Sequence, residues 1–430
     1  MTGTGGFCTL ATMESNHGVV LAGILEAAEN APPVDAVEAV TRELGTTLNA
    51  RTVSFLIADL SGRALVRLAR VPLNGSAGDR RSGEESATVL PFDGGPAEQA
   101  LRTQTVQVLA VPGGWTVLAP VTDRGEVIGL LDLDLPEEPA PEAVREITRT
   151  AHALAFVVIA NRRHTDLFEW GQRTTPYTLS AEIQRRLLPG SFTCEASAFT
   201  LSAWLEPAAS IGGDTFDYSL ARDVLHFSVT DAMGHGVASA LTATLGVGSL
   251  RNSRRGGAGL VEQAGTANAA LIEHAVVPGS YVTAVLGRLD LNTGVCTLLN
   301  AGHVPPLLIR DGVARDLPLP GNFPLGMFPG STFETGELAL RPGDRLVVIT
   351  DGMRERRAAG LDLTARLRKL TGLHPREAVR SLADAVLEVA GPVLADDATL
   401  LMLDWYNGHH EERRTDAGAD QERASAPLPG

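Results

Sequence analysis

Hydrophobic positions in the first third of the chain recur first with a helical spacing and then with a strand-like spacing. Val37, Val40 and Leu44 fall on one face of a helix that Gly45 would end. The runs that follow are short and rich in Val, Leu and Ile, as strands are: 52–57, 64–71, 107–111, 116–121 and 127–133. A polar stretch at 74–87 predicts a loop, and the turn 123–125 predicts a hairpin. We therefore predict a small α+β domain that ends near residue 135.

A long helix is predicted after the prolines at 136–141. Its apolar positions repeat every three or four residues: Val144, Ile147, Ala151, Leu154 and Val158. This is the spacing of a coiled-coil seam and favours a homodimer, but a helix packed on its own sheet has the same spacing. The pattern alone leaves both open. A shorter helix is predicted over 179–187, where a signal from the first domain would have to pass.

From about residue 197 the chain becomes rich in strands. The runs 281–291 and 295–300 flank a turn at 292–294 that contains a glycine. The segments 345–350 and 399–403 are short apolar strands beside acidic residues. Both ends of the sequence look different: residues 1–16 are Gly- and Thr-rich, and 407–430 has no aromatic and almost no large aliphatic side chains. We predict a disordered N-terminal stretch and a solvated tail.

Charge and cysteine content narrow the class of protein. The formal net charge of -15, from 51 acidic and 36 basic residues, argues against binding to nucleic acid or to anionic membrane surfaces. The start of the sequence lacks a signal-peptide pattern, and the most apolar run, 151–160, is about half of what a membrane span needs. Cys8, Cys194 and Cys296 are isolated, as reduced thiols would be. We expect a cytoplasmic protein.

Four aspartates stand at the ends of predicted strands, next to small residues: Asp214, Asp231, Asp351 and Asp396. Hard divalent cations prefer oxygen ligands, and carboxylates from several strands could hold two of them. Such a pair of ions can clamp a phosphate and lower the pKa of a shared water. Each aspartate alone is more easily explained as a turn former than as a metal ligand, so the spacing does not decide between the two roles.

The order of motifs around these acids is more specific. It runs GGDTFD (212–217), DAMGHG (231–236), NAGHVPPL (300–307), PLG (324–326), RPGD to TDG (341–352) and DDATLL (396–401). In this order the motifs resemble the SpoIIE/RsbU-type branch of the metal-dependent (PPM) serine/threonine protein phosphatases, over about 179–405. The resemblance implies an α-β-β-α sandwich of two antiparallel sheets, with two Mn²⁺ or Mg²⁺ ions between them.

The resemblance also implies the metal ligands. Asp231 would bridge both ions, and the backbone carbonyl of Ala232 would bind one of them. Asp351 and Asp396 would hold the other ion, and Asp214 would lie at the first, directly or through water. These four aspartates form the predicted catalytic set.

Four further residues of the motifs stay outside that set. Asp397 matches a position that is often not a ligand and ranks below Asp396. Asp217 matches a recurring acid to which we assign no role. His235 and His303 could be general acids, but a histidine hydrogen-bonded within a turn accounts for them at least as well.

The front of the chain, about 20–160, resembles a GAF sensor domain, an α/β/α fold. A pocket for a small ligand and a ligand-free fold are equally open. The predicted organisation is a disordered stretch (1–16), a GAF-like domain (17–160), a helical linker (161–190), the phosphatase domain (191–406) and the tail (407–430).

Together these features predict a GAF-regulated phosphatase that acts on phosphoserine or phosphothreonine of a partner protein. By resemblance, the partner is a phosphorylated anti-sigma-factor antagonist, and a metal-bound hydroxide attacks phosphorus. The alternative is a pseudophosphatase that senses and docks without catalysis. Retention of all four aspartates favours the enzyme.

Overall fold

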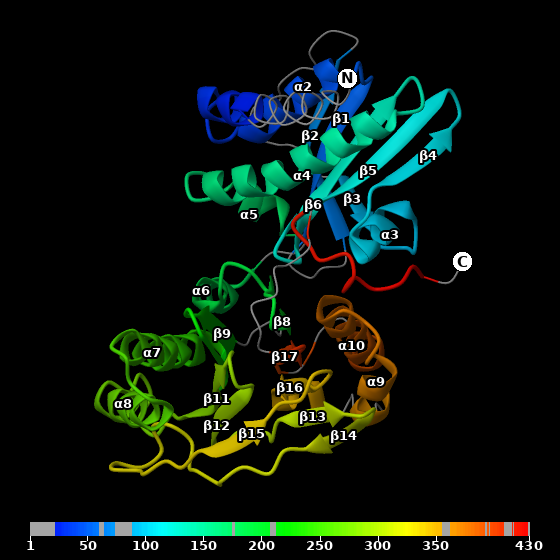
Figure 1. Cartoon of the computed structure of the whole chain (residues 1–430). Coiled ribbons are helices and arrows are strands. Elements are labelled where there is room, and N and C mark those ends of the chain that lie inside the picture. The colour runs from blue at the N-terminus through cyan, green and yellow to red at the C-terminus, as the bar shows by residue number, and fades with distance from the viewer. Residues whose placement is uncertain are drawn as a thin grey trace, which may run out of the picture. The chain divides into compact units, whose positions relative to one another are not determined.

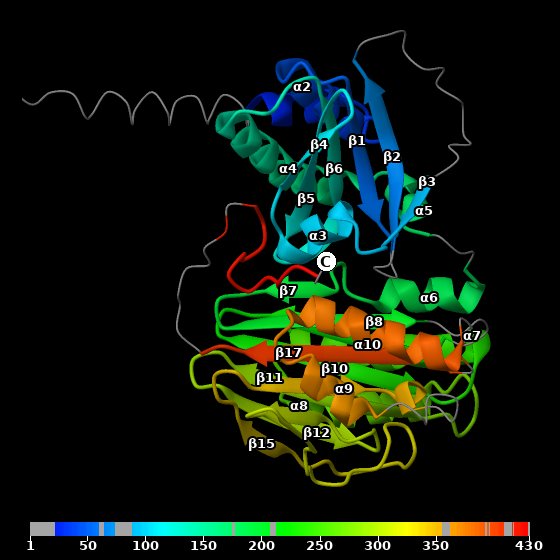
Figure 2. The ribbon, with the colours of Figure 1, turned by 90° about the vertical axis from the view of Figure 1, so that its right-hand side faces the viewer.

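The computed structural model describes residues 22–59, 64–73, 88–173, 177–206, 212–354, 362–391, 394, 396–407, 415 and 417–428. The chain divides into two compact units (Figures 1 and 2). The first contains Met1–Thr175 and Arg414–Gly430, and the second contains Pro176–Arg413. The boundary lies within the predicted helical linker. The predicted N-terminal disorder at 1–16 and the predicted loop at 74–87 lie outside the described residues, as does Cys8.

The first unit is built on one antiparallel sheet. Its strands are β1 (Thr52–Ala58), β2 (Ala64–Pro72), β3 (Thr88–Pro91), β4 (Gln107–Val111), β5 (Gly114–Asp123) and β6 (Glu126–Leu135), in the order β3-β2-β1-β6-β5-β4. Its helices include α2 (Ala36–Thr47), α3 (Pro96–Thr103), α4 (Pro141–Asn161) and α5 (Leu167–Gly171). The predicted hairpin between β5 and β6 is confirmed, with Arg124 and Gly125 at φ 45° and 78°.

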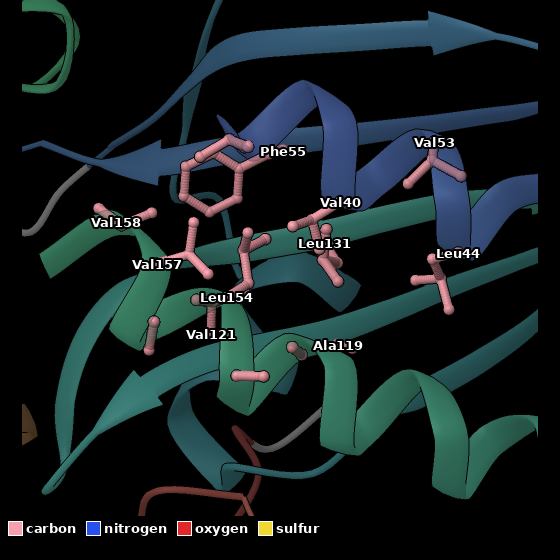
Figure 3. Packing of buried hydrophobic residues seen from close by; sticks show 14 of the residues in the cluster. Val40, Leu44, Val53, Phe55, Ala119, Val121, Leu131, Leu154, Val157 and Val158 are labelled. Carbon is pink, nitrogen blue, oxygen red and sulfur yellow. The ribbon is translucent and has the colours of Figure 1, made fainter. Parts of the chain in front are cut away.

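Helices cover both faces of this sheet. One core cluster joins the sheet to α2 and α4, and a second joins the opposite face to α3. In Figure 3, Leu154 and Val157 of α4 pack in the cluster that contains Phe55 and Leu131 of the sheet. The fold is therefore the α/β/α sandwich that was predicted.

The apolar face of helix α4 packs against the core of its own unit. Ile147, Ala151, Leu154 and Val158 are all buried in the core of this unit, and Val144 is half-buried. A side chain that is buried against its own sheet is not available to a partner helix. The seam therefore gives no basis for the predicted homodimer, and the second explanation of the spacing is the correct one.

The segment 417–428 differs from the predicted solvated tail, because it packs against the first unit. Gly125 N–H donates to the carbonyl of Gly418 (3.1 Å), and Arg102 Nε donates to the carbonyl of Ala426 (2.7 Å). Ala419 is buried. Composition indicated a tail because large apolar residues are missing, but small residues allow the backbone to approach a surface and bond to it directly.

The second unit contains two antiparallel sheets. The five-stranded sheet has the order β15 (Gly336–Ala339), β12 (Val295–Ala301), β11 (Val282–Asp290), β10 (Val224–Ala232) and β9 (Asp214–Leu220). The six-stranded sheet has the order β14 (Val313–Asp316), β13 (Leu307–Arg310), β16 (Arg345–Ile349), β17 (Ala398–Trp405), β8 (Phe199–Glu206) and β7 (Thr193–Glu195). The helices are α6 (Leu179–Leu187), α7 (Gly236–Arg255), α8 (Leu260–Glu273), α9 (Leu363–Lys369) and α10 (Pro375–Ala390).

The sheets and helices of this unit form four layers (Figures 1 and 2). A large apolar cluster fills the space between the two sheets. Helices α7 and α8 pack on the outer face of the five-stranded sheet, and α9 and α10 pack on the outer face of the six-stranded sheet. This is the predicted α-β-β-α sandwich. Cys194 and Cys296 are buried free thiols within it. Among the described helices of the whole chain, none has the length and apolarity that a membrane span requires.

Candidate active site

The predicted acids stand at the strand ends of both sheets. Asp214 is the first residue of β9 and lies directly opposite Asp231 near the end of β10. In the other sheet, Asp351 follows β16, and Asp396 and Asp397 precede β17, its neighbour. Strand pairing therefore brings carboxylates from distant parts of the sequence to one end of the sandwich.

Asp214 joins the two sheets at this end. Its Oδ2 accepts hydrogen bonds from the hydroxyls of Thr350 and Thr399, both at 2.7 Å, and its side chain is buried. Burial and the charges of Asp231 and Asp397 raise its pKa well above the usual range, against the effect of the two threonines. The two threonines were missed in the sequence, because their role depends on how remote strands pair.

Asp397 is held by amide donors. Its Oδ2 accepts from Nε2 of Gln184 (2.7 Å) and from the backbone N–H of Gly213 (3.0 Å). The same Gln184 nitrogen donates to the carbonyl of Asp214 (2.8 Å). Gln184 lies on α6, so this helix contacts the acid cluster directly. In the sequence, the only signal for Gln184 was its place in the helix that precedes Pro189.

Two glycines of the motifs allow the acidic loops to approach each other. A Cβ on Gly213 would lie 2.5 Å from the carbonyl oxygen of Ala232, and a Cβ on Gly352 would lie 1.9 Å from the carbonyl oxygen of Asp397. Both distances are far below contact, so a larger residue would push these loops apart. The same carbonyl of Ala232 accepts a hydrogen bond from the Ser239 hydroxyl (3.1 Å).

The pKa of the Asp231 side chain is strongly perturbed. Burial, together with the charges of Asp351, Asp396 and Asp397, raises its pKa to about 7. Asp351 and Asp396 are exposed. Carboxylate oxygens that repel one another, and some of which are accessible to solvent, are suitable ligands for divalent cations. Among the described residues, however, no three His, Cys, Asp or Glu side chains are close enough together to hold an ion.

Asp217, which was given no role, is an anchor between elements. It forms ion pairs with Arg251 (2.8 Å) and Arg254 (3.0 Å), both on α7. Arg251 also donates to the carbonyl of Leu187 at the end of α6. This acid therefore ties β9 to α7 and, through Arg251, to α6.

The two histidines of the motifs lie in different settings. His235 is exposed and immediately precedes α7. His303 is buried, with Nδ1 2.8 Å from the Thr283 hydroxyl, and burial lowers its pKa to about 4. An imidazole with that pKa is neutral at physiological pH.

The match to a known protein family lies within this second unit. Residues 221–406 match the family model described as stage II sporulation protein E (SpoIIE). Protein IcfG of Synechocystis sp. (strain ATCC 27184 / PCC 6803 / Kazusa) is 25% identical over 258 residues, covering 52% of this chain and 40% of IcfG. The phosphoserine phosphatase RsbU of Bacillus subtilis (strain 168) is 24% identical over 232 residues, covering 52% of this chain and 68% of RsbU.

One similar solved structure contains the RsbU and RsbW domains of Rv1364c from Mycobacterium tuberculosis. It is 26% identical, with a TM-score of 0.44, and the match covers 49% of this chain and 61% of that one. The chain thus spans less than half of the length of IcfG and about two thirds of that of RsbU.

Proposed function

We propose that this chain, whose residues 221–406 form a SpoIIE-family domain, is a metal-dependent protein serine/threonine phosphatase. The observation that carries the proposal is the gathering of Asp214, Asp231, Asp351, Asp396 and Asp397 at one end of the sandwich. There burial, together with the charges of Asp351, Asp396 and Asp397, raises the pKa of Asp231 to about 7. So much negative charge in one place is costly without cations.

Asp231, Asp351 and Asp396 would hold two Mn²⁺ or Mg²⁺ ions, together with Asp214 and the carbonyl of Ala232. When bound, the ions would clamp the phosphate and lower the pKa of the attacking water. The water oxygen would bond to phosphorus, the bond to the serine or threonine oxygen would break, and that oxygen would take up a proton. Because Asp351 and Asp396 are exposed, they can shift toward an ion.

Regulation by the first unit would act through α6. This helix starts shortly after the boundary between the units, and Gln184 on it contacts both Asp397 and the backbone of Asp214. A displacement of α6 would therefore move two members of the cluster. We propose that the GAF-like domain controls the phosphatase in this way.

The substrate would be a phosphorylated anti-sigma-factor antagonist in a partner-switching system. This proposal is supported by the order of motifs that resembles SpoIIE/RsbU-type phosphatases and by the similarity to RsbU, a phosphoserine phosphatase.

The test combines hydrolysis with metal binding. Phosphate release from a serine-phosphorylated antagonist protein of the same cell should stop with a chelator and return with Mn²⁺. Asp231→Asn should abolish it and should also weaken Mn²⁺ binding in calorimetry. The control is Asp311→Asn, an exposed residue on the turn between β13 and β14. Hydrolysis that survives chelation would refute the two-metal site, and Mn²⁺ binding without hydrolysis would indicate the pseudophosphatase.

A further inference from the structure

The loop between β14 and β15 is held rigidly although it has little secondary structure. Asn322 donates to the carbonyls of Asn300 and Glu334, both at 3.0 Å, and accepts from the N–H of Glu334 (2.8 Å). Asn268 on α8 accepts from Gly326 N–H (2.8 Å) and donates to the carbonyl of Phe328 (3.1 Å). Figure 1 shows this yellow segment passing beside α8. Side-chain clamps of this kind fix the conformation of a loop.

This fixed loop carries two aromatic side chains that point outward. Phe323 is 60% exposed and Phe328 is 48% exposed, and their rings stack edge to face with centroids 4.9 Å apart. Leu325 between them is fully buried in the core below α8. Leu325 therefore anchors the loop to the core, while Phe323 and Phe328 stay at the surface as a preorganised aromatic pair. Aromatic residues in such positions are typical anchors of protein interfaces.

Strand register places the pair close to the acid cluster. Ala232, next to Asp231, pairs with Val282, and Val282 exchanges two backbone hydrogen bonds of 2.8 Å with Leu325. Two strand spacings are about 10 Å. A protein interface covers about 800 Å² on each partner, which is a disc of roughly 16 Å radius. A protein whose phosphate sits on the acid cluster would therefore extend over this loop. Met233, two positions after Asp231 in the chain, is also exposed.

We propose that Phe323 and Phe328 form the docking surface for the folded phosphoprotein substrate, which would carry an apolar patch beside its phosphorylated residue. This rests on the proposed phosphatase function. The net charge of -15 does not attract a phosphorylated protein over a distance, so short-range apolar contact supplies the binding that charge does not. The aromatic pair selects the protein, and the acid cluster handles the phosphate.

The test compares two substrates on the full chain. The variant Phe323→Ala/Phe328→Ala should lower kcat/KM for the phosphoserine antagonist protein at least about tenfold, mainly through KM. For p-nitrophenyl phosphate, which is too small to reach the loop, kcat/KM should stay within about twofold. The matched control is Leu220→Ala. Leu220 is 46% exposed and lies on the five-stranded sheet, at the end of β9 that is away from Asp214. It should change neither rate.

Each other outcome has a definite meaning. An unchanged kcat/KM for the phosphoprotein overturns the proposal, and so do equal losses on both substrates, because the pair would then support the site itself. A change on p-nitrophenyl phosphate alone would show that the pair acts on the catalytic site and not on binding of the phosphoprotein, and it also overturns the proposal. If the wild type hydrolyses neither substrate with Mn²⁺, the phosphatase function fails instead. Docking is then judged by fluorescence anisotropy of the labelled phosphoprotein, which must bind the wild type more tightly than the double variant.

Discussion

Gly352 offers the most direct test of how closely the two acidic loops must approach. In Gly352→Ala the new Cβ would lie 1.9 Å from the carbonyl oxygen of Asp397, where real contacts do not fall below 3.0 Å. At least one of the two loops must therefore move by about 1 Å. Displacements of this size at a catalytic site cost about a hundredfold in rate, or roughly 2.7 kcal/mol of transition-state stabilisation.

We expect Gly352→Ala to lower kcat/KM for a phosphoserine protein about a hundredfold in saturating Mn²⁺. The overpacking should also destabilise the fold by about 1–3 kcal/mol. Gly259→Ala is the control, because Gly259 precedes α8 and has no atom within 4 Å of its added Cβ. Activity would be measured by phosphate release, and stability by differential scanning calorimetry at the same metal concentration. A Gly352→Ala enzyme with wild-type kcat/KM would refute the requirement for close approach.

Three further predictions concern the pKa of the site, its contact with α6 and the C-terminal segment. The raised pKa of Asp231 means that the folded state binds a proton more tightly than the unfolded state between about pH 4 and 7, so the Tm of the metal-free chain should fall as pH rises through this window; a flat or rising Tm would contradict this. Gln184→Leu removes the amide donor to the acid cluster and should weaken Mn²⁺ binding by about 10- to 100-fold in calorimetry, whereas unchanged affinity would exclude a role for this contact. Gly418→Val places a Cβ 1.9 Å from the carbonyl of Thr122, so segment 417–428 should detach and be cut by trypsin at least about tenfold faster; equal cleavage rates would show that it does not depend on this docking.

The elements with strong periodicity could be predicted from the sequence, and those that depend on a partner surface could not. The strand predicted at 345–350 is β16, and the helix predicted at 179–187 is α6. Strand β3 and helix α3 were missed, since both are short and a proline stands at one end of each. The stripe on α4 was visible, but its spacing is the same whether a sheet or another helix covers it.

The candidate site divides in the same way. The acids could be predicted because carboxylates at strand ends, in a recognisable order of motifs, carry a strong signal. Thr350, Thr399 and Gln184 could not, because each acts on an acid that is 30 to 213 positions away in the chain. Their role is set by the pairing of remote strands and by the packing of α6, which local sequence does not encode.

The docking of segment 417–428 has a consequence for how the protein is made. The first unit takes in residues up to Thr175 and then residues from Arg414 onward, with the whole second unit in between. During synthesis at about 5–20 residues per second, roughly 10 to 50 seconds separate the two parts. We expect the first unit to fold around its sheet during this interval, while the surface to which segment 417–428 later binds is still exposed. The segment can dock only after the ribosome has translated the entire second unit. A docked segment is therefore found only on chains in which the second unit has already been synthesised.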